Sequence, residues 1–345
     1  MSTALPTVQL GKYGAQVTHL GYGTMGLSAF YGKPKSDEER FKILDRCYEA
    51  GELHWDSADM YQDSEDLLGK WFKANPGKRD NVFLATKFAN CVDASGKRWV
   101  DSSPEYARKA CEKSLQRLGL PFVDLYYVHR LDDKTPIEKT MEELKRLKHE
   151  GKIKHIGLSE CSSETLRRAC KVEHVDAVQV EYSPFSLDIE SEQIGLMKTC
   201  RELGVAIVAY SPIGRGMLGG QIRSPKDFEK GDFRTFAPRF SEENFPKNLQ
   251  LVDTLTELAK KRNATSSQLT LAWLMAQGNE QAPVIPIPGT TNLQRLDENL
   301  AAAKMKLTNE EEQEIRAAVE AAEVHGQRYP EAFAGALFRD TPPLK

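Results

Sequence analysis

The chain has 345 residues, with 47 lysines and arginines against 50 aspartates and glutamates. Because these charges nearly balance and form no basic stripe or acidic tail, neither nucleic acid nor an anionic membrane is an expected partner. No apolar run approaches the ~18 residues that a membrane span needs, no secretory signal is visible, and the cysteines form no CxxC pair or Cys/His cluster. These features predict a cytoplasmic protein with reduced thiols and no metal site.

One pattern recurs along the chain, in which a short apolar or β-branched segment ends in polar residues and a segment of helical periodicity follows. Strands are predicted at residues 19–25, 52–58, 81–88, 123–129, 154–160, 176–182, 205–211 and 282–288. Helices are predicted at 36–50, 103–118, 136–150, 162–172, 190–203, 248–262 and 292–303. The first helix opens with Ser36 and an acidic run, and the second opens Ser-Pro-Glu, which are both typical helix starts.

Eight strands that alternate with helices indicate parallel βα units, and eight is the number that closes a (β/α)8 TIM barrel. An open doubly wound sheet has the same alternation, so the strand count alone leaves it as the alternative. Barrels of ~250 residues and more form one domain, so residues 1–345 are expected to be a single domain.

Three segments lie outside the repeat. An N-terminal β-hairpin is predicted before the first barrel strand, with its turn at Gly11 to Gly14. Residues 213–247 form a loop after the seventh strand that is too long for a plain connector, so a function is expected for it. The tail from His325 is apolar enough to fold back over the barrel mouth.

The segment GYGTMG, residues 21–26, matches the dinucleotide fingerprint G-x-G-x-x-G, and Asp45 stands roughly where a ribose-binding acid would. The fingerprint requires a helix that opens on its third glycine. Here Gly32 and Pro34 break any helix before Ser36, so a Rossmann site is not expected.

Polar side chains recur at the ends of the predicted strands. Asp56, Lys87 and His129 each lie at or near a strand's C-terminal end, and Tyr61 follows its strand by a few residues. In a (β/α)8 barrel these ends converge on the face where active sites lie. We therefore expect Asp56 to anchor Lys87, and Lys87 to lower the pKa of Tyr61 so that this tyrosine acts as a general acid. His129 would bind a substrate oxygen or help to relay the proton.

These residues carry a resemblance to the aldo-keto reductase family that extends over nearly the whole chain. HWDSADMYQDSEDLLGKW resembles the family segment with the catalytic aspartate and tyrosine, FLATKF its lysine strand, and LYYVHR its histidine strand. The resemblance implies that Asp56, Tyr61, Lys87 and His129 are the catalytic tetrad.

The same resemblance implies that NADPH binds without a Rossmann fold. The first turn and Asp56 would lie near nicotinamide and ribose, Ser159 and Gln179 would hold the carboxamide, and Tyr210 would stack on the ring, with the following loop along the pyrophosphate. Glu160 stands where many members have asparagine, which leaves its contact open. The implied cofactor residues up to this loop are Gly23, Thr24, Met25, Asp56, Ser159, Glu160, Gln179, Tyr210, Ser211, Pro212, Ile213, Gly214, Gly216 and Leu218.

The segment IPIPGTTNLQRLDENL, residues 285–300, resembles the family's adenosine-binding segment. Arg295 matches the residue that binds the 2′-phosphate, and a charged hydrogen bond of ~1.5–3 kcal/mol implies a roughly 10- to 100-fold preference for NADPH. The remaining implied residues are Ile287, Gly289, Thr290, Thr291, Glu298 and Asn299.

The resemblance implies reduction of an aldehyde or ketone, with hydride from nicotinamide C4 and a proton from Tyr61. The pyridoxal reductase, perakine reductase and aryl-alcohol dehydrogenase branches look most similar. A different role is implied by family members that bind NADPH as regulatory subunits of potassium channels with little turnover. The lack of a long N-terminal extension and of an obvious large apolar patch favours the free enzyme, as a monomer or weak homo-oligomer.

Overall fold

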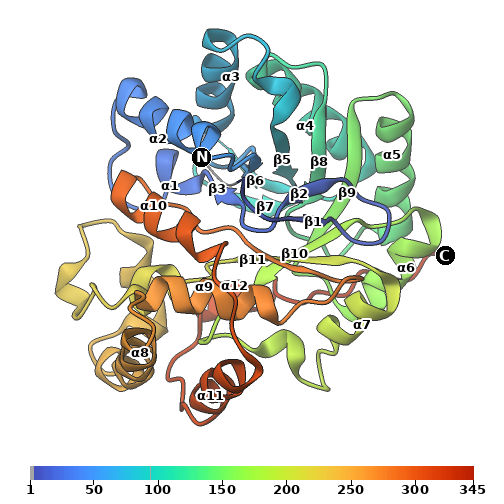
Figure 1. The fold of residues 1–345 in the computed structure, drawn as a ribbon. Coiled ribbons are helices and arrows are strands. Elements are labelled where there is room, and N and C mark those ends of the chain that lie inside the picture. The colour runs from blue at the N-terminus through green and yellow to red at the C-terminus, as the bar shows by residue number, and fades with distance from the viewer. Residues whose placement is uncertain (1–3, 94) are drawn as a thin grey trace.

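The computed structural model describes residues 4–93 and 95–345 and shows a ring of strands surrounded by helices (Figure 1). Eight strands form one sheet in the order β12-β11-β10-β9-β8-β5-β4-β3, and every neighbouring pair is parallel. The two edges of this sheet meet where the backbone N–H of Gly21 donates to the carbonyl of Pro286 at 2.9 Å. The predicted (β/α)8 barrel is confirmed, and the open doubly wound sheet is excluded.

The strands and helices follow the predicted alternation, although most strands are shorter than expected. The barrel strands are β3 (Tyr22–Gly23), β4 (His54–Asp56), β5 (Phe83–Phe88), β8 (Val123–Val128), β9 (Ile153–Ser159), β10 (Ala177–Glu181), β11 (Ala206–Tyr210) and β12 (Val284–Pro286). The helices are α1 (Met25–Ser28), α2 (Asp37–Glu49), α3 (Ser64–Ala74), α4 (Pro104–Leu118), α5 (Ile137–His149), α6 (Ser163–Val172), α7 (Leu196–Leu203), α8 (Phe245–Lys260), α9 (Ser266–Ala276), α10 (Leu293–Ala302), α11 (Asn309–Glu320) and α12 (Glu331–Ala334). In the described part of the chain, no helix has the length and apolar character needed to cross a bilayer.

The two predicted helix starts are confirmed. Ser36 and Glu39 form a reciprocal capping box at the start of α2, and the Ser103 side chain accepts the backbone N–H of Tyr106 at the start of α4. The helix predicted at 190–203 begins only at Leu196, because Gly195 precedes it with a left-handed φ of 58°.

Five helices were missed from the sequence: α1, α3, α9, α11 and α12. The expectation that no helix forms before Ser36 is wrong, since α1 makes one short turn directly after Thr24 and ends before Gly32. The N-cap of α3, Asp63, makes no side-chain capping bond, so no start pattern marks it. Helix α9 is buried on nearly all sides and shows no amphipathic period. A second hairpin was also missed. In it, β6 (Asn90–Val92) pairs antiparallel with β7 (Arg98–Val100).

The N-terminal hairpin is confirmed, since β1 (Thr7–Gln9) pairs antiparallel with β2 (Gln16–Thr18). Its Leu10 and Val17 are buried in the same cluster as Ala85 and Leu125 of the barrel strands. The N–H of Lys12 donates to the carbonyl of Gly204, just before β11 begins, at 2.7 Å. The hairpin therefore covers the N-terminal end of the barrel, opposite to the polar strand ends.

The C-terminal tail covers the other end, as predicted. Arg339 forms an isolated parallel bridge with Cys161, two residues after the end of β9. Its N–H donates to the carbonyl of Glu160 at 3.0 Å, and its carbonyl accepts the N–H of Ser162 at 3.0 Å. The long loop after the seventh strand, β11, contains four short 3-10 turns, at Gly214–Gly219, Pro225–Asp227, Phe233–Phe236 and Pro238–Phe240.

Candidate active site

The four residues predicted to do the chemistry come together at the C-terminal end of the barrel. Asp56 is the last residue of β4, Lys87 is the penultimate residue of β5, and His129 directly follows β8. Tyr61 lies in the turn between β4 and α3, where its N–H donates to the carbonyl of Ala58 at 3.1 Å. Strands β4, β5 and β8 lie side by side in register. Side chains that are distant in sequence therefore meet at the same end of the sheet.

The centre of this group is a buried ion pair between Lys87 and Asp56. The ammonium group of Lys87 is fully buried and bonds both the carboxylate of Asp56 and the carbonyl of Ser57, the latter at 2.7 Å. The second oxygen of Asp56 accepts the side-chain amide of Gln179 at 2.8 Å. The Tyr61 hydroxyl lies 3.5 Å from the Lys87 nitrogen. Since each buried charge has a partner, the pair fixes the ammonium group beside the phenol.

Tyr61 was predicted to have a pKa below its ordinary value because Lys87 lies beside it. This prediction is wrong. Burial raises the pKa of Tyr61 above 10.0, and this outweighs the opposing effect of the Lys87 charge. The residue keeps its proton throughout the neutral range. A protonated phenol with a hydrogen-bonding cation beside it is still suited to donate a proton.

His129 stands edge-on to Tyr61, with 5.9 Å between the ring centroids. Burial, together with the charges of Lys87 and Arg130, lowers the pKa of His129 well below 6.5, so the ring is neutral near pH 7. Its Nδ1 atom is buried and has no hydrogen-bond partner in the described part of the chain. Such an atom fits a ligand that brings its own polar group.

Asp59 is separate from this group, although it lies only three residues after Asp56. Burial, with a smaller effect of Glu65, raises the pKa of Asp59 to about 7, and one carboxyl oxygen has no hydrogen-bond partner among the described residues. Its carboxyl group therefore takes no part in the Lys87 ion pair.

This carboxyl group predicts a pH-dependent stability. Because the folded protein holds the proton more tightly than the unfolded chain, the stabilisation is fully present below about pH 4 and is lost as the pH rises through about 7. We expect Asp59→Asn to gain more stability over wild type at pH 8 than at pH 5, measured by urea unfolding. Asp80→Asn, at an exposed position, is the control. An equal gain at both pH values would contradict the assignment.

The residues expected to hold the carboxamide lie beside the ion pair. Ser159 ends β9, Gln179 lies in β10, and both are buried. The side chain of Thr24 turns inward, where its hydroxyl donates to the Asp56 carbonyl at 3.0 Å. Met25 packs with Tyr61 in a small apolar cluster.

Glu160 has a different environment from that expected of a cofactor residue. Its backbone has a left-handed φ of 50°, and its carboxylate is fully buried. Arg328 of the tail binds both of its oxygens at 3.0 Å, and the Tyr210 hydroxyl donates to it at 2.8 Å. These charges and bonds outweigh burial and lower the pKa of Glu160. The Glu160 carboxylate thus holds the C-terminal tail, through Arg328, over the mouth of the barrel.

The loop after Tyr210 turns sharply, with positive φ at Ser211 (50°), Gly214 (52°) and Gly216 (93°). Leu218 is fully buried, and its carbonyl accepts the Ser266 hydroxyl at 2.6 Å. The structure thus brings the backbone of this loop to the strand ends. Pro212 is buried there and Ile213 is partly exposed.

The segment after β12 begins next to the first strand. A Cβ on Gly289 would lie only 2.5 Å from the carbonyl oxygen of Gly23, so this close approach requires glycine. The partly exposed Thr290 accepts the Tyr22 hydroxyl with its carbonyl at 2.7 Å. Thr291 is also partly exposed, and Ile287 is buried.

The start of α10 carries the residues expected at the adenosine end. The exposed guanidinium of Arg295 donates to the side-chain oxygen of Gln221 at 2.6 Å and forms no ion pair in the described ranges. Glu298 instead accepts the Thr265 hydroxyl at 2.6 Å, and Asn299 is buried. Arg295 therefore has no charged partner among the described residues, as expected of a residue that would bind the 2′-phosphate of NADPH.

Sequence reasoning missed the arginines at the site. Arg117 reaches from α4 to the carbonyl of Asp59 at 3.0 Å and to buried Glu65 at 2.8 Å, and so holds the turn that carries Tyr61. No local pattern marks such a contact. Arg130 was visible as the residue after His129, but nothing in the sequence gave it a role.

Comparisons with known proteins agree with this architecture. The model of the Aldo/keto reductase family matches residues 19–320. The chain is 49% identical over 345 residues to aldo-keto reductase str7 of Strobilurus tenacellus and 48% identical over 344 residues to aldo-keto reductase yakc [NADP(+)] of Schizosaccharomyces pombe. Each comparison covers 99% of both chains.

Solved structures are similar as well. The glycerol dehydrogenase AKR11B4 of Gluconobacter oxydans has a TM-score of 0.81 at 26% identity, with 93% of this chain and 97% of that chain covered. The holo form of aldo-keto reductase AKR11C1 of Bacillus halodurans has a TM-score of 0.74 at 26% identity, with coverages of 94% and 100%. The chain therefore belongs to the aldo/keto reductase family.

Proposed function

We propose that this protein reduces an aldehyde or ketone to the alcohol with NADPH, and that Tyr61 donates the proton to the carbonyl oxygen. The observation that carries the proposal is the Tyr61 hydroxyl, 3.5 Å from a buried ammonium group that Asp56 holds in place. The relative in Schizosaccharomyces pombe is named as using NADP(+), which supports this choice of cofactor.

In this proposal each side chain has a separate task. NADPH, when bound, supplies the hydride from its nicotinamide ring. Tyr61 keeps its proton until the carbonyl oxygen gains negative charge, and Lys87 stabilises the phenolate that remains. The neutral His129, whose ring stands edge-on to Tyr61, would orient the carbonyl oxygen.

The test is the consumption of NADPH with a panel of aromatic and aliphatic aldehydes and ketones. Turnover of several carbonyl compounds, with the alcohol as product, is the expected result. Tight binding of NADPH without turnover of any carbonyl compound would contradict the proposal and would favour a role as a cofactor-sensing subunit.

The position of Arg295 leads us to expect that the protein binds NADPH more tightly than NADH. Its guanidinium has no ion pair in the described part of the chain, so the 2′-phosphate of NADPH would be its charged partner. We expect Arg295→Gln to weaken NADPH binding by about 10- to 100-fold and to leave NADH binding nearly unchanged, measured by fluorescence titration. Arg46→Gln, on the neighbouring helix α2, is a charge-matched control. Equal losses for both cofactors would place the phosphate elsewhere.

A further inference from the structure

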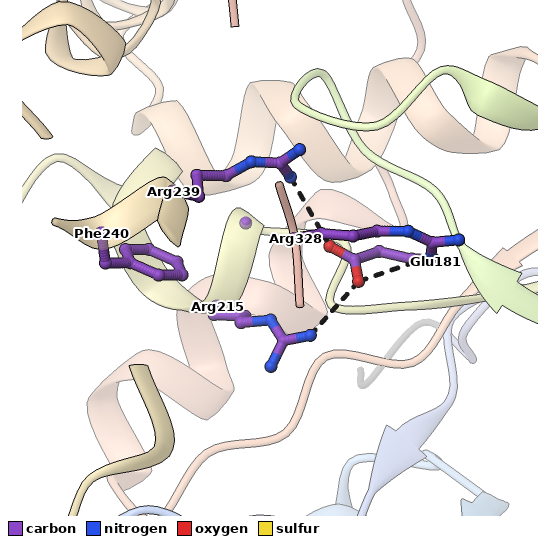
Figure 2. Close-up of a pocket in the computed structure, with 6 residues that line it drawn as sticks. Glu181, Arg215, Arg239, Phe240 and Arg328 are labelled. Carbon is purple, nitrogen blue, oxygen red and sulfur yellow. Dashed lines mark hydrogen bonds and ion pairs between the residues drawn. The ribbon is translucent and has the colours of Figure 1, made fainter. Parts of the chain in front are cut away.

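Arginine side chains are concentrated at the mouth of the barrel. Figure 2 shows that Arg215, Arg239 and Arg328 converge on the buried carboxylate of Glu181, with N–O distances of 3.3, 3.7 and 3.6 Å. Arg328 also binds both oxygens of Glu160. In this cluster, three guanidinium groups thus share two carboxylates.

Arg130 adds a further positive charge, and no described acidic residue forms an ion pair with it. It directly follows His129, and its Nη1 atom donates to the His129 carbonyl at 2.7 Å and to the Ser159 hydroxyl at 3.2 Å. In the described residues its Nε and Nη2 atoms bond no protein group, and it takes part in no ion pair. The nearby carboxylate of Glu160 is already bound on both oxygens by Arg328.

The guanidinium of Arg130 lies close to the reacting groups. Burial opposes its charge, but the neighbouring Tyr210, Tyr329, Glu160 and Tyr61 more than offset this effect and raise its pKa. The side chain is only partly exposed. A partly buried cation beside the site favours an anionic ligand, because few water molecules compete for it.

The position of Arg130 separates it from the phosphates proposed for the cofactor. Those phosphates are expected along residues 211–218, after β11, and 289–295, after β12. Arg130 instead follows the end of β8 and reaches Ser159 at the end of β9. Ser159 is one of the residues expected to hold the nicotinamide carboxamide. The substrate is the ligand expected at that end.

We propose that Arg130 binds a carboxylate of the substrate, so that the preferred substrates are aldehydes or ketones that also carry a carboxylate. This inference rests on the proposed carbonyl reduction. The free Nε and Nη2 donors form one edge of the guanidinium, which matches the two oxygens of a carboxylate. Arg130 thereby selects the substrate and holds its carbonyl group near Tyr61.

The test compares substrates of equal size that differ only in charge. We expect the wild type to reduce 3- or 4-formylbenzoate with a kcat/KM about 10- to 100-fold higher than the matching formylbenzamide. In Arg130→Gln and Arg130→Met this ratio is expected to fall to about one. Arg146→Gln removes an exposed arginine from the outer face of α5 and is expected to keep the wild-type ratio.

The ratio decides the proposal independently of absolute rates. A wild type that reduces both members of each pair equally well overturns it, and so does a preference that persists in the Arg130 variants. If one replacement fails to fold, the other gives the same ratio. Absence of turnover with every aldehyde, while NADPH binds, would instead refute the proposed reduction itself.

Discussion

Replacement of Tyr61 by phenylalanine is expected to lower kcat for NADPH-dependent carbonyl reduction by about 10²–10⁴-fold. The change removes only the hydroxyl that lies 3.5 Å from the Lys87 nitrogen. The ring remains, with its edge-to-face contacts to Phe30 (6.3 Å) and His129 (5.9 Å), so the pocket keeps its shape. The measurement is steady-state NADPH oxidation with an aldehyde that the wild type reduces.

A parallel titration of NADPH separates chemistry from binding. The phenylalanine variant is expected to bind NADPH with nearly the wild-type dissociation constant, because no described hydrogen bond of the fold depends on this hydroxyl apart from that to Lys87. A variant with the wild-type kcat would exclude Tyr61 as the proton donor.

Removal of the buried cation in Lys87→Met is expected to destabilise the fold by about 3–5 kcal/mol, because it leaves the Asp56 carboxylate buried without its charged partner. Asp56 is 2% exposed, so water does not replace the lost ammonium group. Carbonyl reduction is expected to fall as well, since no cation remains beside Tyr61 to stabilise a phenolate. The measurements are urea unfolding and NADPH oxidation.

The double variant Asp56→Asn/Lys87→Met distinguishes the two effects. Without the unpaired charge, most of the lost stability is expected to return, whereas the activity is not. Asparagine retains an acceptor for the side-chain amide of Gln179. If the double variant were as unstable as Lys87→Met alone, the cost would arise from packing and not from the isolated charge.

The sequence was sufficient to predict which polar residues meet at the barrel mouth, because strands place their residues by simple rules. In a βα unit of a barrel, a polar residue at the end of an apolar run lies at the C-terminal mouth. Asp56, Lys87 and His129 all lie there. Two missed helices also had readable starts, since Thr265 with Gln268 and Thr308 with Glu311 form capping boxes.

Other features depend on contacts that no local pattern contains. The pKa of Tyr61 is set by how completely the fold removes water from the phenol, which the neighbouring residues in the chain do not determine. Glu160 meets Arg328, which is 168 residues away in the chain. Arg130 follows His129 in sequence, but its ion pairing depends on the whole mouth, where no described acidic residue pairs with it.

The tail that fastens onto Glu160 also has a consequence for biosynthesis. Every barrel strand precedes residues 325–341 in the chain, so the ribosome completes the barrel's sequence before it makes this segment. Two residues of α6 bind the end of this segment. The Thr165 hydroxyl accepts the N–H of Thr341 at 3.1 Å, and Arg168 donates to the Thr341 carbonyl at 2.8 Å. Folding in the order of synthesis thus produces an uncovered barrel first, and the tail docks onto strand ends that are already formed.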